Sequence, residues 1–489
     1  MDTISLPSEL WGEVFKHISA DWLPHVTLTC QAFRTLGIPR LFHEFIFHPY
    51  FVDLGMLSRS RIVPQMRYAP DDETIEDAMK RLEFFASSSI SSHVYKCEIT
   101  PWDSGDVDQS YDFGSSDPDN LLNAFFERLP QFSNLQHLDC YSVNFKSFAL
   151  SQLSLVPDIH QLKLSSCNVF TTSVLPTVHA RTFHFGYAGR PEVLSQCGAG
   201  KWFHLLDLDR LEDLKVWPNH ASTAIFGDAT ALPSLTATRR LSLALPLSLI
   251  PTLPIILQRL PSLQRLHISQ FGSQDSHQSQ VLANQIPHST PPPLLHYEGP
   301  YELLHLVIAP GMLSLSLDSF GPDVCDPDIL SRQLVSYKHS VKNIKFFRAK
   351  LLRLDPSFFS DVCSLFIDLK AVYIEAGYGN DVFTPTGFLD DLPIDKLPVG
   401  IEHIIMDWSA QNYEEAESKS VSFKDRLVNQ RSSIKSVWLS DRTHLAFFWK
   451  REESGRETVK KYPIDSATAR YAAILARTKF YPDTFLLEL

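Results

Sequence analysis

The sequence predicts an α/β fold in which a small N-terminal helical module precedes a solenoid with a parallel sheet. Two observations lead to this prediction. A short apolar pattern recurs along most of the 489 residues, and segments with helical periodicity lie before many of its copies. The first 50 residues differ from the rest, because their apolar residues follow helical spacing alone.

The recurring pattern is an apolar residue, two variable residues, an apolar residue, one variable residue and a third apolar residue. Its clear copies begin at Leu135, Ile159, Leu211, Leu263, Met312, Val341, Leu369, Ile401 and Ile434, with looser copies at Ala180, Thr238 and Pro292 and an early one at Val94. The middle residues from Leu138 to Val437 recur on average about every 27 residues. This mean lies within the ~20–29 residues of leucine-rich repeats.

The spacing has a physical reason. The second and third apolar residues are two apart, so they lie on the same face of a strand. Helical stripes precede several strands, as at Leu121, Phe125 and Leu129. Strand–loop–helix units in series stack into a solenoid with a parallel sheet along one side. The alternative is a set of unrelated α/β units with chance matches, and the regular spacing of twelve copies favours the solenoid.

Changes in composition and in apolar periodicity along the chain divide it into four segments. Residues 1–50 form the helical module, and 51–120 hold a connecting helix, the first strand and an acidic stretch expected to be an exposed insertion. Residues 121–445 form the leucine-rich-repeat-like solenoid. We expect 446–489 to cap it, starting with a hairpin that turns at Glu453, Ser454 and Gly455.

Charge and composition argue against several classes of function. The formal charge of −12 gives no basic footprint for nucleic acid. The apolar run from Leu241 to Leu257 contains three prolines, so we expect a buried strand and helix there and no membrane span. The seven cysteines are dispersed and lack zinc-ligand spacing, which predicts free thiols in a reducing compartment, no metal and no cofactor.

The N-terminal module resembles a known family. Its apolar and motif residues match the F-box, which begins Leu-Pro-x-Glu-Leu and ends in a Cys-x-x-Phe-Arg segment: Leu6, Pro7, Glu9, Leu10, Val14, Phe15, Ile18, Leu23, Leu28, Cys30, Phe33, Arg34, Leu36 and Leu41. The match covers about 40 residues. The segment from His296 to Phe320 also resembles the solenoid part of fungal F-box proteins.

The resemblance implies a function. F-box proteins bind the Skp-type linker subunit of cullin–RING ubiquitin ligases, in the cytoplasm or nucleus, and their downstream domain binds the protein substrate. On this resemblance the linker contacts are expected at Leu6, Pro7, Leu10, Val14 and Ile18. The alternative for each of these residues is packing within the module.

The motifs of catalysis are missing or degraded in the sequence, so we expect a substrate adaptor and no enzyme. No GxSxG or HExxH motif is present, and Gly198–Trp202 lacks the residues of a phosphate loop. In each repeat, the residues one and three positions after the middle apolar residue are expected to face solvent. The aromatic residues at such positions are the candidates for substrate contacts, namely Trp217, Phe347, Tyr373 and Trp438. A scaffold with no ligase role and an unrecognised hydrolase are the alternative functions.

Overall fold

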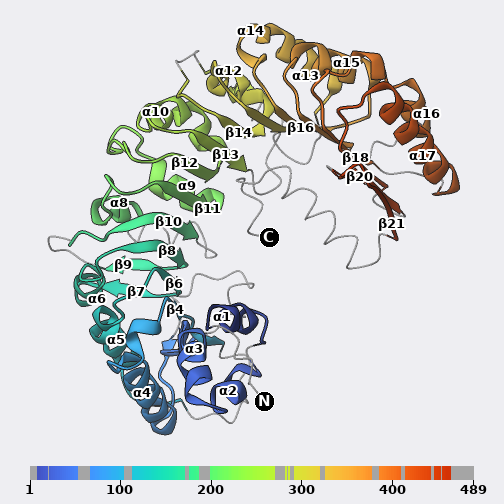
Figure 1. The fold of residues 1–489 in the computed structure, drawn as a ribbon. Coiled ribbons are helices and arrows are strands. Elements are labelled where there is room, and N and C mark those ends of the chain that lie inside the picture. Colours follow the sequence, from blue (N-terminus) through green and yellow to red (C-terminus); the bar gives the residue numbers. More distant parts are fainter. Residues whose placement is uncertain are drawn as a thin grey trace, which may run out of the picture. The chain divides into compact units, whose positions relative to one another are not determined.

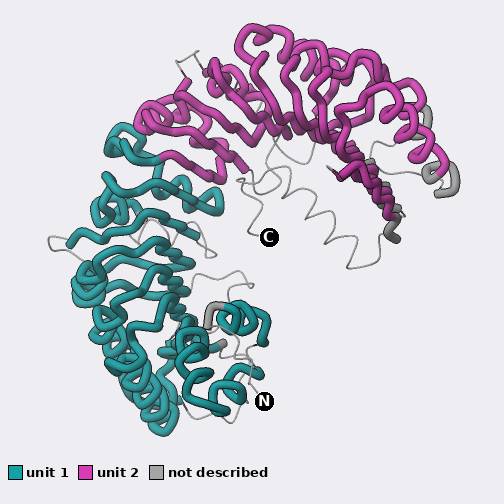
Figure 2. Tube along the Cα trace, in the orientation of Figure 1, with its two compact units in different colours: residues 1–238 teal, residues 239–489 magenta. Residues whose placement is uncertain are grey.

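The computed structural model describes residues 8–19, 21–52, 67–103, 113–170, 176–186, 199–269, 281–283, 285–286, 291–319, 325–376, 385–408, 413–441, 445–452 and 454–463. Its contacts divide the chain into two compact units, unit 1 (Met1–Thr238) and unit 2 (Arg239–Leu489), which Figure 2 shows in different colours. Each unit is described by itself. The four-segment division predicted from the sequence stays a prediction.

Three short helices begin unit 1, as the sequence predicts: α1 (Ser8–Lys16), α2 (Leu23–Thr27) and α3 (Gln31–Leu41). The ring of Phe33 packs against Trp11 at 4.6 Å and against Phe15 at 5.4 Å, which joins α3 to α1. Helices α2 and α3 approach closely at Gly37, where a Cβ atom would lie 2.0 Å from Thr27 Cγ2. Only glycine fits at this crossing.

Six parallel strands form the main sheet in the described part of unit 1. In spatial and chain order its strands are β1 (Glu44–Phe47), β4 (Lys96–Ile99), β6 (His137–Tyr141), β8 (Ile159–Ser165), β10 (Ala180–Gly186) and β11 (Asp213–Trp217). The first strand, β1, falls inside the segment that the sequence assigns to the helical module. The early copy of the repeat at Val94 becomes β4.

The helices of unit 1 that follow the N-terminal module lie along one face of this sheet (Figure 1). They are α4 (Asp72–Ala86), η2 (Ser91–His93), α5 (Asp119–Arg128), η4 (Leu129–Gln131), α6 (Ser147–Leu153), η5 (Ala199–Lys201), α8 (Trp202–Leu205) and α9 (Asn219–Phe226). Aromatic rings join strands to helices, with Phe45 stacked on Phe85 at 4.3 Å and Phe47 on Phe125 at 5.2 Å. The alternate, fully buried strand residues therefore form the core.

The repeat in unit 1 has the geometry of a leucine-rich repeat. After β8 the chain turns at Ser166, whose φ is 55°, and the run from Ile159 to Val169 fits the longer pattern L-x-x-L-x-L-x-x-N/C-x-L with Cys167 at the N/C position. The Cys167 thiol donates to the carbonyl of Cys140 in the preceding repeat at 3.3 Å. This bond crosses from one repeat to the next beside the sheet.

Unit 2 contains ten strands in chain order. Eight are parallel, β12 (Arg240–Ala244), β13 (Arg265–Ser269), β14 (His296–Pro300), β15 (Ser314–Asp318), β16 (Phe346–Leu351), β17 (Ala371–Ala376), β18 (His403–Trp408) and β19 (Ser436–Asp441), and the antiparallel hairpin β20 (Leu445–Arg451) and β21 (Glu457–Pro463) follows. The hairpin predicted from the sequence is present, and Gly455 at its turn has a φ of 81°. The rest of the predicted cap, residues 464–489, lies outside the described residues.

The helices of unit 2 also lie along one face of its strands (Figure 1). They are η6 (Leu247–Thr252), α10 (Leu253–Gln258), η7 (Tyr301–Leu303), α12 (Leu304–Val307), α13 (Pro327–Ser336), α14 (Lys338–Val341), α15 (Pro356–Leu365), α16 (Pro385–Asp391), η8 (Ile394–Lys396) and α17 (Tyr413–Gln430). Asp326 caps α13 by accepting from the Asp328 amide at 2.8 Å. The apolar run from Leu241 forms a strand and then η6 and α10, as expected.

Two of the twelve repeat copies have a different register from the predicted one. In the copy at Val341, the core-facing strand residues are Phe347 and Ala349, which align with Leu315 and Leu317 of the neighbouring strand. In the copy at Pro292, Tyr297 takes the position predicted for Leu295. A shift by an odd number of residues exchanges the two faces of a strand, so the error at Val341 changes the predicted surface.

A small three-stranded sheet of β2 (Phe51–Val52), β3 (Arg67–Tyr68) and β5 (Trp102–Asp103) begins within the segment 51–120. The described ends of the acidic stretch are ordered, because β5 pairs with β2 and Asp119 begins α5. The prediction of an exposed insertion is therefore wrong for these ends. Residues 104–112 lie outside the described part of the chain.

Candidate functional site

The face of each sheet that points away from the helices, called here the helix-distal face, carries the side chains available for contacts. In unit 1 this face is polar and solvated. Lys96 on β4, next to the edge strand, contacts three carboxylates, with Nζ 2.6 Å from Glu44 Oε1, 3.3 Å from Glu98 Oε2 and 3.8 Å from Asp139 Oδ2. The hydrogen bond to Glu44 raises the pKa of Lys96, and burial raises that of Asp139.

The helix-distal face of unit 2 carries a denser network around Arg348 on β16. Its guanidinium lies 3.2 Å from Glu298 on β14 and 3.2 Å from Glu375 on β17, and its Cζ lies 5.2 Å from the centre of the Tyr373 ring. The Tyr373 hydroxyl donates to Asp407 Oδ2 at 2.6 Å. These contacts link β14 with the three consecutive strands β16, β17 and β18 on one face.

Asp318 on β15 lies beside this network. Burial, followed by repulsion from Glu298, raises the pKa of its carboxyl to about 7, while the positive charges of Arg348 and Lys350 oppose the shift. Its Oδ1 is enclosed and has no hydrogen-bond partner within the described part of the chain. A substantial fraction of the Asp318 carboxyl group is therefore protonated at neutral pH, which is unusual for aspartate.

The four candidate substrate contacts have different surroundings. Trp217 at the end of β11 is 43% exposed, as predicted, and lies against Gly186. The prediction that Phe347 faces solvent is wrong, because the register of β16 turns it into the core, where it is 0% exposed and packs on Phe366 at 5.1 Å. Tyr373 and Trp438 lie on the helix-distal face but are only 3% exposed.

Sequence reasoning missed Arg348, Glu298 and Asp407; it placed Glu375 at an outward position but did not select it as a contact residue. The sequence contains a signal for Arg348. Ile344, Phe347 and Ala349 have the spacing of the three apolar positions of the repeat, and they fit it as well as the copy that starts at Val341 does. In that register Arg348 and Lys350 take the outward positions predicted for Lys345 and Phe347. The carboxylates that contact Arg348 are set by the order of the strands in the sheet, and this order cannot be read directly from the sequence.

The N-terminal module presents exposed apolar side chains. Leu10 and Val14 on α1 are 50% and 44% exposed, and Trp22 and Leu28 are more exposed still. Leu10 and Val14 are four residues apart, so they lie on one face of α1, beside the Trp11 and Phe15 face that packs on α3. Ile18 is partly exposed, and Leu6 and Pro7 lie outside the described residues.

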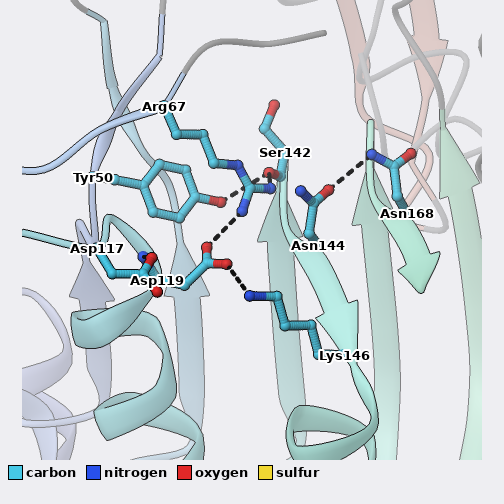
Figure 3. Close-up of polar contacts among 8 residues, drawn as sticks. All are labelled: Tyr50, Arg67, Asp117, Asp119, Ser142, Asn144, Lys146 and Asn168. Atoms are coloured by element: carbon cyan, nitrogen blue, oxygen red, sulfur yellow. Dashed lines mark hydrogen bonds and ion pairs between the residues drawn. The ribbon is translucent and has the colours of Figure 1, made fainter. Parts of the chain in front are cut away.

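A buried network of hydrogen bonds and ion pairs joins β3 and α5 to the first repeats (Figure 3). Arg67 lies 2.8 Å from Asp119 and donates to the Ser142 carbonyl at 2.7 Å, and its Cζ lies 4.5 Å from the ring of Tyr50. The Tyr50 hydroxyl donates to the same carbonyl at 2.8 Å, and Lys146 lies 2.7 Å from Asp119. Ser142 has a φ of 56°, which turns its carbonyl out of the ladder at the end of β6.

No group of three or more His, Cys, Asp or Glu side chains among the described residues has the arrangement of a metal site. No described helix is long and apolar enough to span a bilayer. Burial raises the pKa of the described core thiols Cys97, Cys140 and Cys167, which keeps them protonated. These cysteines are packing residues of the sheet core.

Comparisons with known proteins show likeness at the level of solved structures. No protein-family model and no curated protein matches the chain. It is similar to the leucine-rich repeat-containing protein LegL7 from Legionella pneumophila, at 12% identity and a TM-score of 0.34 over 74% of this chain and 97% of that one. A Bacteroides fragilis protein matches at 12% identity and a TM-score of 0.28, over 74% and 79%. The leucine-rich-repeat-like fold of the chain follows from its own strand register and repeat geometry.

Proposed function

We propose that this protein is an adaptor that binds other proteins and performs no catalytic step. The N-terminal module binds the Skp-type linker subunit of a cullin–RING ubiquitin ligase, and the solenoid binds a protein substrate, in the cytoplasm or nucleus. The observation that carries the proposal is the exposed apolar stripe of Leu10 and Val14 on a module that resembles an F-box. Exposed apolar stripes of this kind favour burial against a partner.

The energetics support a helix-in-groove contact. Burying apolar surface contributes about 25 cal/mol per Å². Leu10 and Val14 repeat at i and i+4, the spacing by which an amphipathic helix contacts a groove. Under the proposal, Leu6, Pro7 and Ile18 extend the same contact surface. The substrate surface is the helix-distal face, on which Trp217 is an exposed aromatic residue and Arg348 is a partly exposed charged one.

Point variants test the linker contact better than a deletion. Removing residues 1–47 would also remove β1, which pairs with β4 at the edge of the sheet. We therefore propose Leu10→Ala with Val14→Ala, and expect recovery of a co-expressed Skp-type linker to fall about ten- to hundredfold, which corresponds to a loss of about 1.4–2.8 kcal/mol.

Leu352→Ala with Val335→Ala is the matched control, because these two side chains of unit 2 are 40% and 46% exposed. The control pair should keep full recovery, and both double variants should keep the melting temperature of the native chain. Unchanged recovery with the Leu10 and Val14 variant would remove the ligase role and leave a scaffold that binds partners through the solenoid alone.

A further inference from the structure

A cavity of about 210 Å³ lies among the helical segments of unit 2, away from the helix-distal face. Its walls come from η7, α12 and α13, with Ile286 and Leu304 as the apolar part. The volume is below the ~300–1,000 Å³ of pockets that hold drug-sized ligands, and about seven times the ~30 Å³ that a water molecule occupies in the liquid. It suits the end of a side chain or a small amine.

The described lining of this cavity is mostly polar. Glu302 is its acidic residue and is only 6% exposed, and His305, Gln333, Tyr301 and Tyr337 complete the polar walls. A carboxylate in such an enclosed position interacts with a cation several times more strongly than it would in water. Anionic groups are excluded from the cavity for the same reason.

The neighbouring polar groups add acceptors. His305 Nδ1 lies 3.1 Å from the Glu302 carbonyl oxygen, which only accepts, so Nδ1 carries the proton of this hydrogen bond. Gln333 Oε1 is buried with no hydrogen-bond partner among the described residues. Burial raises the pKa of both tyrosines, so their rings stay neutral and electron-rich.

We propose that this cavity is a binding site for a primary ammonium or guanidinium group, held by the Glu302 carboxylate, the Gln333 amide oxygen and the rings of Tyr301 and Tyr337. Such a cation offers several N–H donors to walls rich in acceptors, and a positive charge to aromatic rings. The site goes beyond the proposed adaptor function and does not depend on the linker contact.

The test uses the full chain and four small probes observed by saturation-transfer NMR. We expect n-butylammonium and methylguanidinium to bind with saturable, millimolar affinity, and n-butanol and butyrate to bind at least tenfold more weakly. A capped Gly-Lys-Gly peptide distinguishes the source of the cation. Binding of the peptide assigns the site to a protein side chain, and binding of the free cations alone assigns it to small amines.

Variants locate the binding. Glu302→Gln should weaken both cations at least tenfold, whereas Glu127→Gln, which removes an exposed carboxylate in unit 1, should leave them unchanged. Gln333→Leu is a second cavity variant, for use if Glu302→Gln lowers the melting temperature. We expect it to weaken the binding of both cations severalfold. The proposal is overturned if neither cation saturates, if butyrate binds equally well, or if both cavity variants keep native affinity.

Discussion

The helix-distal faces of the two units are built from the same strand alternation and differ in solvation. In unit 1, every described outward position from β1 to β11 is at least partly exposed, and Lys96 holds its carboxylates at the surface. In unit 2, Tyr373, Asp407 and Trp438 occupy equivalent positions and are nearly fully buried. The Tyr373 hydroxyl and the Asp407 carboxylate satisfy each other at 2.6 Å.

The difference shows that a repeat pattern determines which residues face outward but does not determine whether those residues are exposed to solvent. A charged pair in water contributes ~0–1 kcal/mol, because solvent screens it, whereas removing one partner of a desolvated pair costs several times more. Unit 1 places its own desolvated ion pairs at the strand ends, around Arg67 and Asp119 (Figure 3). The desolvated ion pairs of unit 1 therefore lie apart from its helix-distal face, whereas the buried polar contacts of unit 2 lie on that face.

The largest effect is expected at the strand ends of unit 1. Arg67→Met removes the guanidinium from the buried Asp119 carboxylate, which keeps only the more exposed Lys146, and removes one of the two donors to the Ser142 carbonyl, which keeps the Tyr50 hydroxyl. We expect a loss of about 3–5 kcal/mol, which lowers the melting temperature of the transition of unit 1 by about 6–20 °C. Arg181→Met, which breaks an exposed pair with Asp158, is the control and should cost about 1 kcal/mol or less. Equal shifts for the two variants would contradict the buried network.

The second effect compares two similarly exposed cations on the helix-distal faces. The Arg348 and Lys96 side chains are 29% and 31% exposed. Arg348→Met should cost about 1.5–3 kcal/mol, because it removes hydrogen bonds to Glu298 and Glu375, whereas Lys96→Met should cost about 1 kcal/mol or less. Thermal unfolding followed by circular dichroism measures both. A larger loss for Lys96→Met would reverse the comparison.

The third effect concerns the pH dependence of stability. The pKa of Asp318 rises from 3.8 to about 7 on folding, so the folded state holds this proton more tightly than the unfolded state. Stability from this group is therefore complete below pH 3.8 and falls as the pH rises to about 7, by at most ~1.4 kcal/mol per pH unit. Asp318→Asn should flatten this part of the stability curve, measured by urea unfolding between pH 4 and 8. Asp139→Asn in unit 1 should flatten it less, and an unchanged slope for Asp318→Asn would refute the shift.

The sequence alone determined the kind of fold. The periodic apolar residues predicted the parallel strands, since a two-residue step along a strand returns to the same face. Ten of the twelve copies from Leu138 to Val437 have the predicted register, and the three N-terminal helices and the final hairpin are present. The F-box resemblance and the linker contacts at Leu10 and Val14 stay predictions.

Only the tertiary structure decided which outward residues are solvated and which polar groups meet. Phe347 and Arg348 are adjacent in the sequence, and a choice of register between them decides which lies in the core. Arg67 reaches Asp119 and Ser142 across 52 and 75 residues, and Glu302 shares a cavity with Gln333 from another helix. Strand alternation is a local property of the chain, whereas desolvation depends on neighbours that the chain brings together only when it folds.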